Sequence, residues 1–96
     1  MPSRVLAKIR ALVRSRQYVM TLRAEEEMDA DGLSIFDVEN ALLAGGIVGR
    51  QTDRESRERK YLVQGPSVDQ ATDLVVVVKF GRGGKLVIVT LYGNES

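Results

Sequence analysis

The 96-residue sequence contains no cysteine and no histidine. Without cysteine there is no disulfide bond and no thiolate ligand for a metal ion. Without histidine the chain lacks the usual general base near neutral pH and the commonest metal ligand. Any acid–base chemistry must therefore use Glu, Asp, Lys, Tyr or an assisted water molecule.

The sequence also has only two prolines and no long hydrophobic run. No run approaches the roughly 18–20 apolar residues that a bilayer-spanning helix needs, and no basic start precedes an apolar stretch and a cleavage site. We therefore expect a cytoplasmic protein that does not enter a membrane. With 44% hydrophobic residues, 96 residues suffice for one folded domain, residues 1–96, and leave no room for a second core.

Charge is distributed unevenly, although the formal net charge is only +1. Six basic and no acidic residues precede Ala24, and seven acidic and no basic residues follow it as far as Asn40. A second basic segment spans residues 50–60 and contains Arg50, Arg54, Arg57, Arg59 and Lys60. The net charge gives no overall attraction to nucleic acid, but the two basic segments create local positive fields.

The acidic segment raises the question of a metal site. Five carboxylates between residues 25 and 31 offer the oxygen ligands that hard cations prefer. A metal site needs ligands that converge from several directions, whereas neighbours on one short helix point apart. We therefore expect a solvated helix face, no metal and no cofactor.

Three segments show helical spacing of apolar residues, and they span residues 3–16, 21–31 and 34–44. Ser3 is a suitable N-cap for the first, and Gly32 follows the second as a residue that tolerates a left-handed conformation. Ser34 precedes the clearest pattern, with Asp37 in the position of a capping-box acid. Gly45 ends that helix.

From residue 47 the pattern changes to that of strands, which we expect at residues 47–51, 59–65, 74–80 and 85–92. The last two are apolar on both faces and are joined by "GRGG", so they predict an antiparallel hairpin. The expected fold class is α+β, with the N-terminal helices packed on one face of a curved antiparallel β-sheet meander. The other face needs cover from a helix, a tail or another chain, so a homodimer is one expected assembly.

Strand alternation predicts which side chains share a face of this sheet. Val75 and Val77 belong to one face, and Lys79, which interrupts the apolar strand, lies with them. Tyr92 is expected on the other face, beside Leu86 and Ile88. Lys79 either marks the edge of a cleft or extends its ammonium group to solvent at the end of the strand.

The stretch "GRGGK", residues 81–85, superficially suggests a phosphate-binding loop. It lacks the spacer and the Lys-Ser/Thr pair of a P-loop, and a strand follows it where an anion site of that kind needs a helix N-terminus. We therefore expect a hairpin turn.

The basic strand around Tyr61 is a candidate for RNA binding. Arg57, Arg59 and Lys60 would neutralise phosphate, and the ring of Tyr61 would stack on a base, as single-stranded RNA requires. The alternative is an ordinary charged hairpin with Tyr61 partly buried.

Several motifs together resemble a bacterial family, domain of unknown function family 4258. The family pattern has "Y-x-x-T-x-H-A-x-x-x-M", then "G-[IL]-S-x-x-D-V-x-x-A-L", a "K/R-Y-L-V-x-G" strand and a terminal hairpin. The matching residues are Tyr18, Thr21, Ala24, Met28, Gly32, Leu33, Ser34, Asp37, Val38, Ala41, Leu42, Lys60, Tyr61, Leu62, Val63, Gly65, Val75, Val76, Leu86, Ile88, Thr90 and Tyr92.

This family looks related to the RelE-like toxins, including the MqsR and BrnT types. The resemblance implies a RelE-like fold, a metal-independent endoribonuclease that acts on mRNA, and a cognate antitoxin protein as partner. In such an enzyme the 2′-hydroxyl of the RNA is the nucleophile. The implied catalytic residues are Lys60, Lys79, Arg82 and Tyr92, converging on an open sheet face, and the implied RNA-binding residues are Arg23, Arg57, Arg59 and Tyr61.

Arg23 departs from the family pattern, which has histidine at this position. Arginine binds phosphate but exchanges no proton near pH 7, because its pKa exceeds about 12. If the histidine is catalytic in the family, this chain is feeble or inactive; if it is structural, Arg23 simply replaces one polar group by another. Three hypotheses follow: a toxin-like endoribonuclease, a non-catalytic RNA- or protein-binding member of the family, and a dimeric module without nucleic acid.

Overall fold

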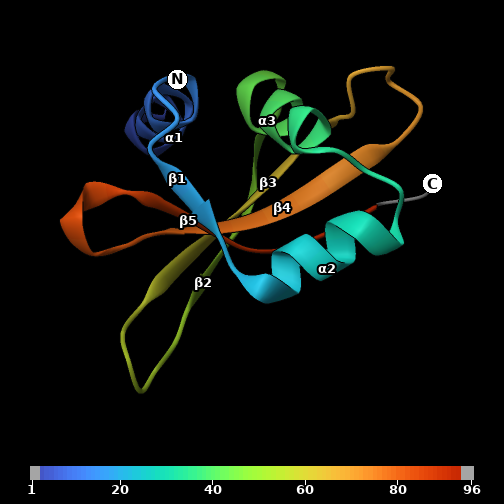
Figure 1. Ribbon diagram of the computed structural model, residues 1–96. Coiled ribbons are helices and arrows are strands. Elements are labelled where there is room, and N and C mark those ends of the chain that lie inside the picture. Colours follow the sequence, from blue (N-terminus) through green and yellow to red (C-terminus); the bar gives the residue numbers. More distant parts are fainter. Residues whose placement is uncertain (1–2, 94–96) are drawn as a thin grey trace.

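The computed structural model describes residues 3–93 (Figure 1). In chain order the elements are α1 (Arg4–Arg14), β1 (Tyr18–Met20), α2 (Leu22–Ala30), α3 (Ile35–Ala44), β2 (Gly46–Thr52), β3 (Arg59–Pro66), β4 (Asp73–Phe80), the 3₁₀ turn η1 (Arg82–Gly84) and β5 (Leu86–Gly93). The expected α+β class is confirmed, as are the helices and strands predicted from the sequence. None of the helices within residues 3–93 is long and apolar enough to cross a membrane.

Each helix begins at the residue that the sequence predicts. Ser3, Thr21 and Ser34 accept backbone N–H bonds from residues three positions later. At Ser34 the Asp37 carboxylate also accepts from the Ser34 backbone N–H, which completes the capping box. These local bonds satisfy N–H groups that the first helical turn leaves without partners.

The five strands have the order β1-β5-β4-β3-β2. Strands β2 to β5 form the predicted antiparallel meander, but β1 pairs with β5 in parallel. The sheet is therefore mixed: the antiparallel meander is as predicted, and β1 adds a parallel strand that the sequence analysis did not include. β1 has only three residues, so no alternation of its own marks it, and it is held by bonds to β5 and its flanks, such as Thr21 N–H to the Ile88 carbonyl at 3.0 Å.

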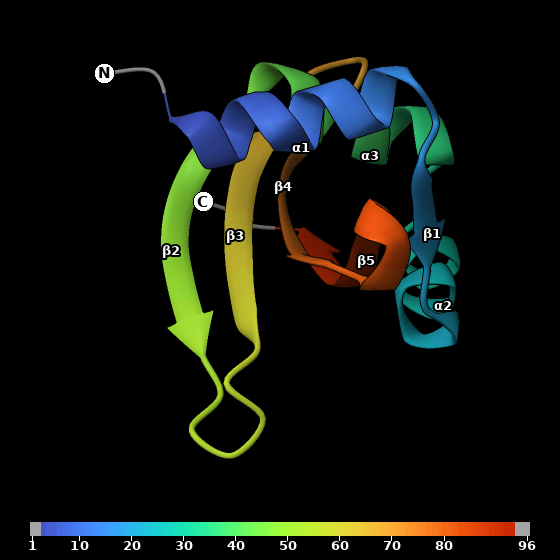
Figure 2. The same ribbon diagram turned by 90° about the vertical axis from the view of Figure 1, so that its left-hand side faces the viewer.

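Helices α1 and α3 cover one face of the sheet, which we call the inner face (Figure 1). Val63 and Val76 are fully buried there against Ile9 of α1 and Leu42 of α3. Helix α2 lies beside β5, where β1 has ended (Figure 2). We call the opposite face of the sheet the outer face. It carries Val75 and Val77 and their cross-strand partners.

A β-bulge changes the face of the last residues of β5. Val77 pairs with Thr90, but Val78 pairs with Ile88, so Val89 is an extra residue in β5. Tyr92 consequently pairs with Val75 and lies on the outer face. The prediction that Tyr92 lies with Leu86 and Ile88 is wrong, because strict alternation fails at the bulge.

The "GRGG" segment is a turn, as expected. Residues 82–84 form a short 3₁₀ turn between β4 and β5. Gly83 and Gly84 have φ angles of 78° and 82°, a left-handed conformation that glycine adopts without steric cost.

Candidate functional site

The alternation of β3 separates the residues that the sequence singled out. Arg59 and Tyr61 lie on the inner face with their partners Thr52 and Arg50, whereas Lys60 lies on the outer face. Two groups of candidate residues therefore lie on opposite faces of one sheet, and each must be judged separately.

The inner face carries what we call the cationic–aromatic cluster: Lys8, Arg50, Arg59, Tyr61 and Phe80. The rings of Tyr61 and Phe80 meet edge to face, with centroids 6.0 Å apart. Lys8 Nζ from α1 lies 4.4 Å from the Phe80 centroid, and the Arg50 guanidinium carbon lies 5.9 Å from the Tyr61 centroid. Helix α1 and strand β2 thus each place a cation over one of two adjoining rings, which β3 and β4 carry.

Arg50 and Arg59 border a small hollow beside Tyr61. The hollow has a volume of about 240 Å³ and is also lined by Gln51 and Thr52. The three cations of the cluster are exposed, while only 8% of the surface of Tyr61 is exposed. Neither of the two ion pairs formed within residues 3–93 involves a cation of the cluster, so these positive charges are not neutralised by such pairs.

The outer face brings the two predicted catalytic lysines together. Lys60 precedes Tyr61 and Lys79 follows Val78, and the Cα atoms of Tyr61 and Val78 are partners. Lys60 and Lys79 are therefore neighbours across β3 and β4. Lys79 Nζ donates to both carboxylate oxygens of Glu58, at 2.8 and 3.1 Å, so the lysine that interrupts the apolar strand has its counter-ion in the loop before β3.

Arg82 and Tyr92 lie at different ends of this face. Arg82 is exposed in η1, just beyond the β4 end that carries Lys79. Tyr92 pairs with Val75, which is four residues from Lys79 along β4, or about 13 Å at roughly 3.3 Å per residue. The structure groups Lys60, Lys79 and Arg82 near one end of the sheet and leaves Tyr92 near the other.

Arg23 and Arg57 are not among the residues that form the cationic–aromatic cluster. The Arg23 Nε atom donates to Glu27 at 3.0 Å within α2, and the Arg23 side chain is 77% exposed. Arg57 lies in the loop between β2 and β3 with φ of 59°, and its backbone N–H donates to the Asp53 carbonyl. Of the four predicted RNA-binding residues, Arg59 and Tyr61 are the two that meet.

Several side chains have shifted pKa values because of contacts that hold the fold together. Burial and a hydrogen bond to Glu39 raise the pKa of Tyr18 to about 12. The Thr90 hydroxyl, and next the Arg23 side chain, lower the pKa of Glu27.

Within the described part of the chain, no three Asp or Glu side chains converge as a metal site would require.

Sequence reasoning missed Lys8, Arg50, Phe80 and Glu58 as site residues. Arg50 was counted only as part of a basic segment, although pairing residues 47–51 with 59–65 across the charged loop would have placed it opposite Tyr61. Lys8 belongs to α1 and meets Phe80 only through tertiary packing. No local signal in the sequence marks that contact.

A family model described as "Domain of unknown function (DUF4258)" matches residues 20–93. The matched region contains all strands of the meander and both helices that follow β1. The comparisons with curated proteins and with solved structures found no match.

Proposed function

Because the chain belongs to the DUF4258 family of domains of unknown function, its activity must be inferred from the site, and we propose that the protein binds single-stranded RNA through the cationic–aromatic cluster. The supporting observation is that Lys8 and Arg50 lie over the rings of Phe80 and Tyr61, and that Arg59 lines the hollow beside Tyr61. Arginine and lysine neutralise phosphate, and flat rings or guanidinium planes stack on unpaired bases.

The geometry favours stacking by arginine at this site. Tyr61 is largely covered, so a base reaches it at its edge, while the Arg50 guanidinium above the ring is exposed. A guanidinium plane offers both a stacking surface and donors for phosphate oxygens. Arg59, across the hollow, supplies the next phosphate contact along the strand.

Fluorescence anisotropy with labelled oligouridine at several salt concentrations tests the proposal. Arg50→Ala and Arg59→Ala should each weaken binding about tenfold and reduce the slope of log K against log salt by about 1. Arg23→Ala is the matched control, because Arg23 is exposed and lies outside the cluster. A salt-independent affinity, or equal losses in all three variants, would reject the cluster as the RNA site.

We propose RNA cleavage on the outer face as a second candidate, supported by the Glu58–Lys79 pair beside Lys60. In this scheme Glu58 accepts the proton of the 2′-hydroxyl, whose oxygen attacks the adjacent phosphorus as the bond to the 5′-oxygen breaks. The departing 5′-oxygen takes a proton from solvent water. Lys60, Lys79 and Arg82 stabilise the negative charge on the phosphoryl oxygens. Tyr92 is too far along the sheet to share this centre and would at most contact another nucleotide.

The cleavage proposal includes a relation to RelE-like toxins and a cognate antitoxin as partner, both of which the resemblance implies. RNA incubated with micromolar protein and a metal chelator should yield 2′,3′-cyclic phosphate ends. Glu58→Gln should lower the rate about 10²–10⁴-fold, whereas the exposed Glu26→Gln should not. RNA that stays intact with the unmodified protein would remove this candidate and leave the binding proposal standing.

A further inference from the structure

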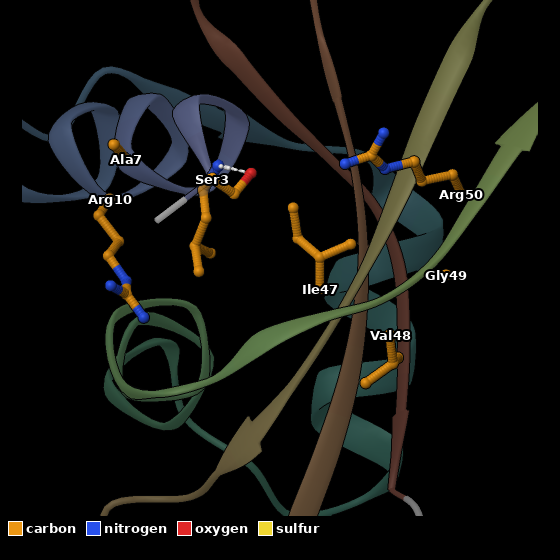
Figure 3. A pocket seen from close by; sticks show the side chains of 8 residues that line it. Ser3, Ala7, Arg10, Ile47, Val48, Gly49 and Arg50 are labelled. Carbon is orange, nitrogen blue, oxygen red and sulfur yellow. Dashed lines mark hydrogen bonds between the residues drawn. The ribbon is translucent and has the colours of Figure 1, made fainter. Parts of the chain in front are cut away.

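A groove between α1 and β2 shares Arg50 with the cationic–aromatic cluster, but neither proposed function uses the rest of its lining. It has a volume of about 570 Å³. Its middle is aliphatic, formed by Leu6 and Ala7 of α1 and Ile47 of β2. Figure 3 shows Arg10 on one side of Ile47 and Arg50 on the other. The groove therefore has an apolar centre and a positive charge at each end.

Strand β2 is the last strand in the sheet order, so β3 pairs with it on one side only (Figure 2). Such an edge presents backbone N–H and C=O groups that an added strand can pair with. Val48 lies at a register shift of β2 and is 58% exposed. The edge and the groove together form one continuous surface for an extended chain.

Arg10 supplies a second reason to expect an anionic occupant. Its Nη2 atom donates to the Gly45 carbonyl at 2.8 Å, which anchors the guanidinium. Its Nε atom is buried, and within residues 3–93 it has no hydrogen-bond partner. A buried donor without an acceptor costs free energy, which a carboxylate entering the groove would recover after a small shift of the side chain.

We propose that the α1–β2 groove and the free edge of β2 bind an extended, acidic segment of a partner protein. The segment adds a strand to β2, its apolar side chains cover the aliphatic centre and its carboxylates meet Arg10 and Arg50. A second copy of this chain fits less well, because pairing through β2 would bring the arginines of both copies to one seam. RNA also fits less well, because the centre of the groove is aliphatic and offers no ring for base stacking.

Amide NMR of the full chain, titrated with a synthetic peptide, tests the inference. The probe alternates Glu and Val over about six residues, the usual length of a strand, and a Lys–Val peptide of the same length is its control. The Glu–Val peptide should shift amides of residues 46–52 and of α1 in a saturable way, and the Lys–Val peptide should not.

Val48→Asp should weaken binding of the Glu–Val peptide about tenfold, because it places a negative charge at the β2 edge beside the glutamates of the peptide. Val68→Asp is the matched control, because Val68 is 59% exposed and lies in the β3–β4 loop. Neither substitution touches the cationic–aromatic cluster, so RNA binding should survive in both. Equal binding of both peptides, shifts that leave β2 unaffected, or shifts of β2 that depend on protein concentration alone would each overturn the inference. Oligouridine shifts at Ala7, Arg10 and Ile47, away from the shared Arg50, would also overturn it.

Discussion

Gly65 lies at a point where the backbone of β3 passes close to that of α3. A Cβ atom at this position would collide with the carbonyl oxygen of Ala41, and a Cβ atom at Gly45 would collide with the carbonyl oxygen of Gln64. Both obstacles are backbone atoms, so no side-chain rotation relieves them. The absence of side chains at these two glycines lets α3 approach the sheet.

Gly65→Ala should therefore lower the free energy of unfolding by about 1–3 kcal/mol, because the helix or the strand must move to admit the methyl group. Gly46→Ala is the matched control, since nothing lies within 4 Å of a Cβ atom there and its φ is not left-handed. It should change stability by less than about 0.5 kcal/mol. The midpoint of urea unfolding measures both, and equal shifts in the two variants would contradict the close approach.

At the scale of elements, polar side chains attach α2 to β5. The Thr21 hydroxyl donates to the Val89 carbonyl at 2.6 Å, and the Thr90 hydroxyl donates to the Glu27 carboxylate at 2.8 Å. Arg23 donates to the same carboxylate oxygen. Arg23 thus belongs to a contact that orients Glu27 toward β5.

These contacts predict a pH dependence of stability. The Thr90 hydroxyl and Arg23 lower the pKa of Glu27 in the folded protein. The resulting stabilisation is present above the unfolded pKa of about 4.3 and is lost as the pH falls through the lower folded pKa. The free energy of unfolding of Glu27→Gln should therefore fall less steeply below about pH 4 than that of the unmodified protein. Parallel pH profiles from urea unfolding would contradict this role, and Glu26→Gln serves as the exposed control.

At the scale of the whole molecule, β4 is the centre of the sheet. It pairs with β3 on one side and β5 on the other, and residues 74–78 are all buried. Val75 and Val77, on the outer face, are only 4% and 7% exposed, so side chains of the flanking strands cover much of that face. A homodimer through the outer face stays a prediction, as does the cytoplasmic location.

Hydrogen exchange should reflect this arrangement. The amides of residues 75–78 should exchange most slowly, with opening free energies close to that of global unfolding. The amides of β1, which has three residues at the edge of the sheet, should exchange through local opening at a much lower free energy. NMR-detected exchange measures both sets, and protection of β1 equal to that of β4 would show that the edge strand is an integral part of the cooperative core.

The family pattern and the helix caps are local properties of the chain. Ser34 and Asp37 meet because they are three residues apart, and the meander follows from alternating strands joined by short turns. The pairing of β1 with β5 joins segments about seventy residues apart in the sequence, and the bulge at Val89 arises from the register between β4 and β5. That is why the sheet is mixed and Tyr92 changes face, in disagreement with the local pattern.

The candidate sites likewise combine features that depend on local sequence with features that depend on tertiary structure. The sequence by itself determined the α+β class, the ends of the helices, and the absence of cysteine and histidine chemistry, because these depend on residue type and on neighbours within one turn or hairpin. Only the tertiary structure decided that Tyr61 faces Arg50 and that Lys79 meets Glu58 on the opposite side. Side chains next to each other in a strand point to opposite faces, so which charges meet is decided by the pairing of distant strands.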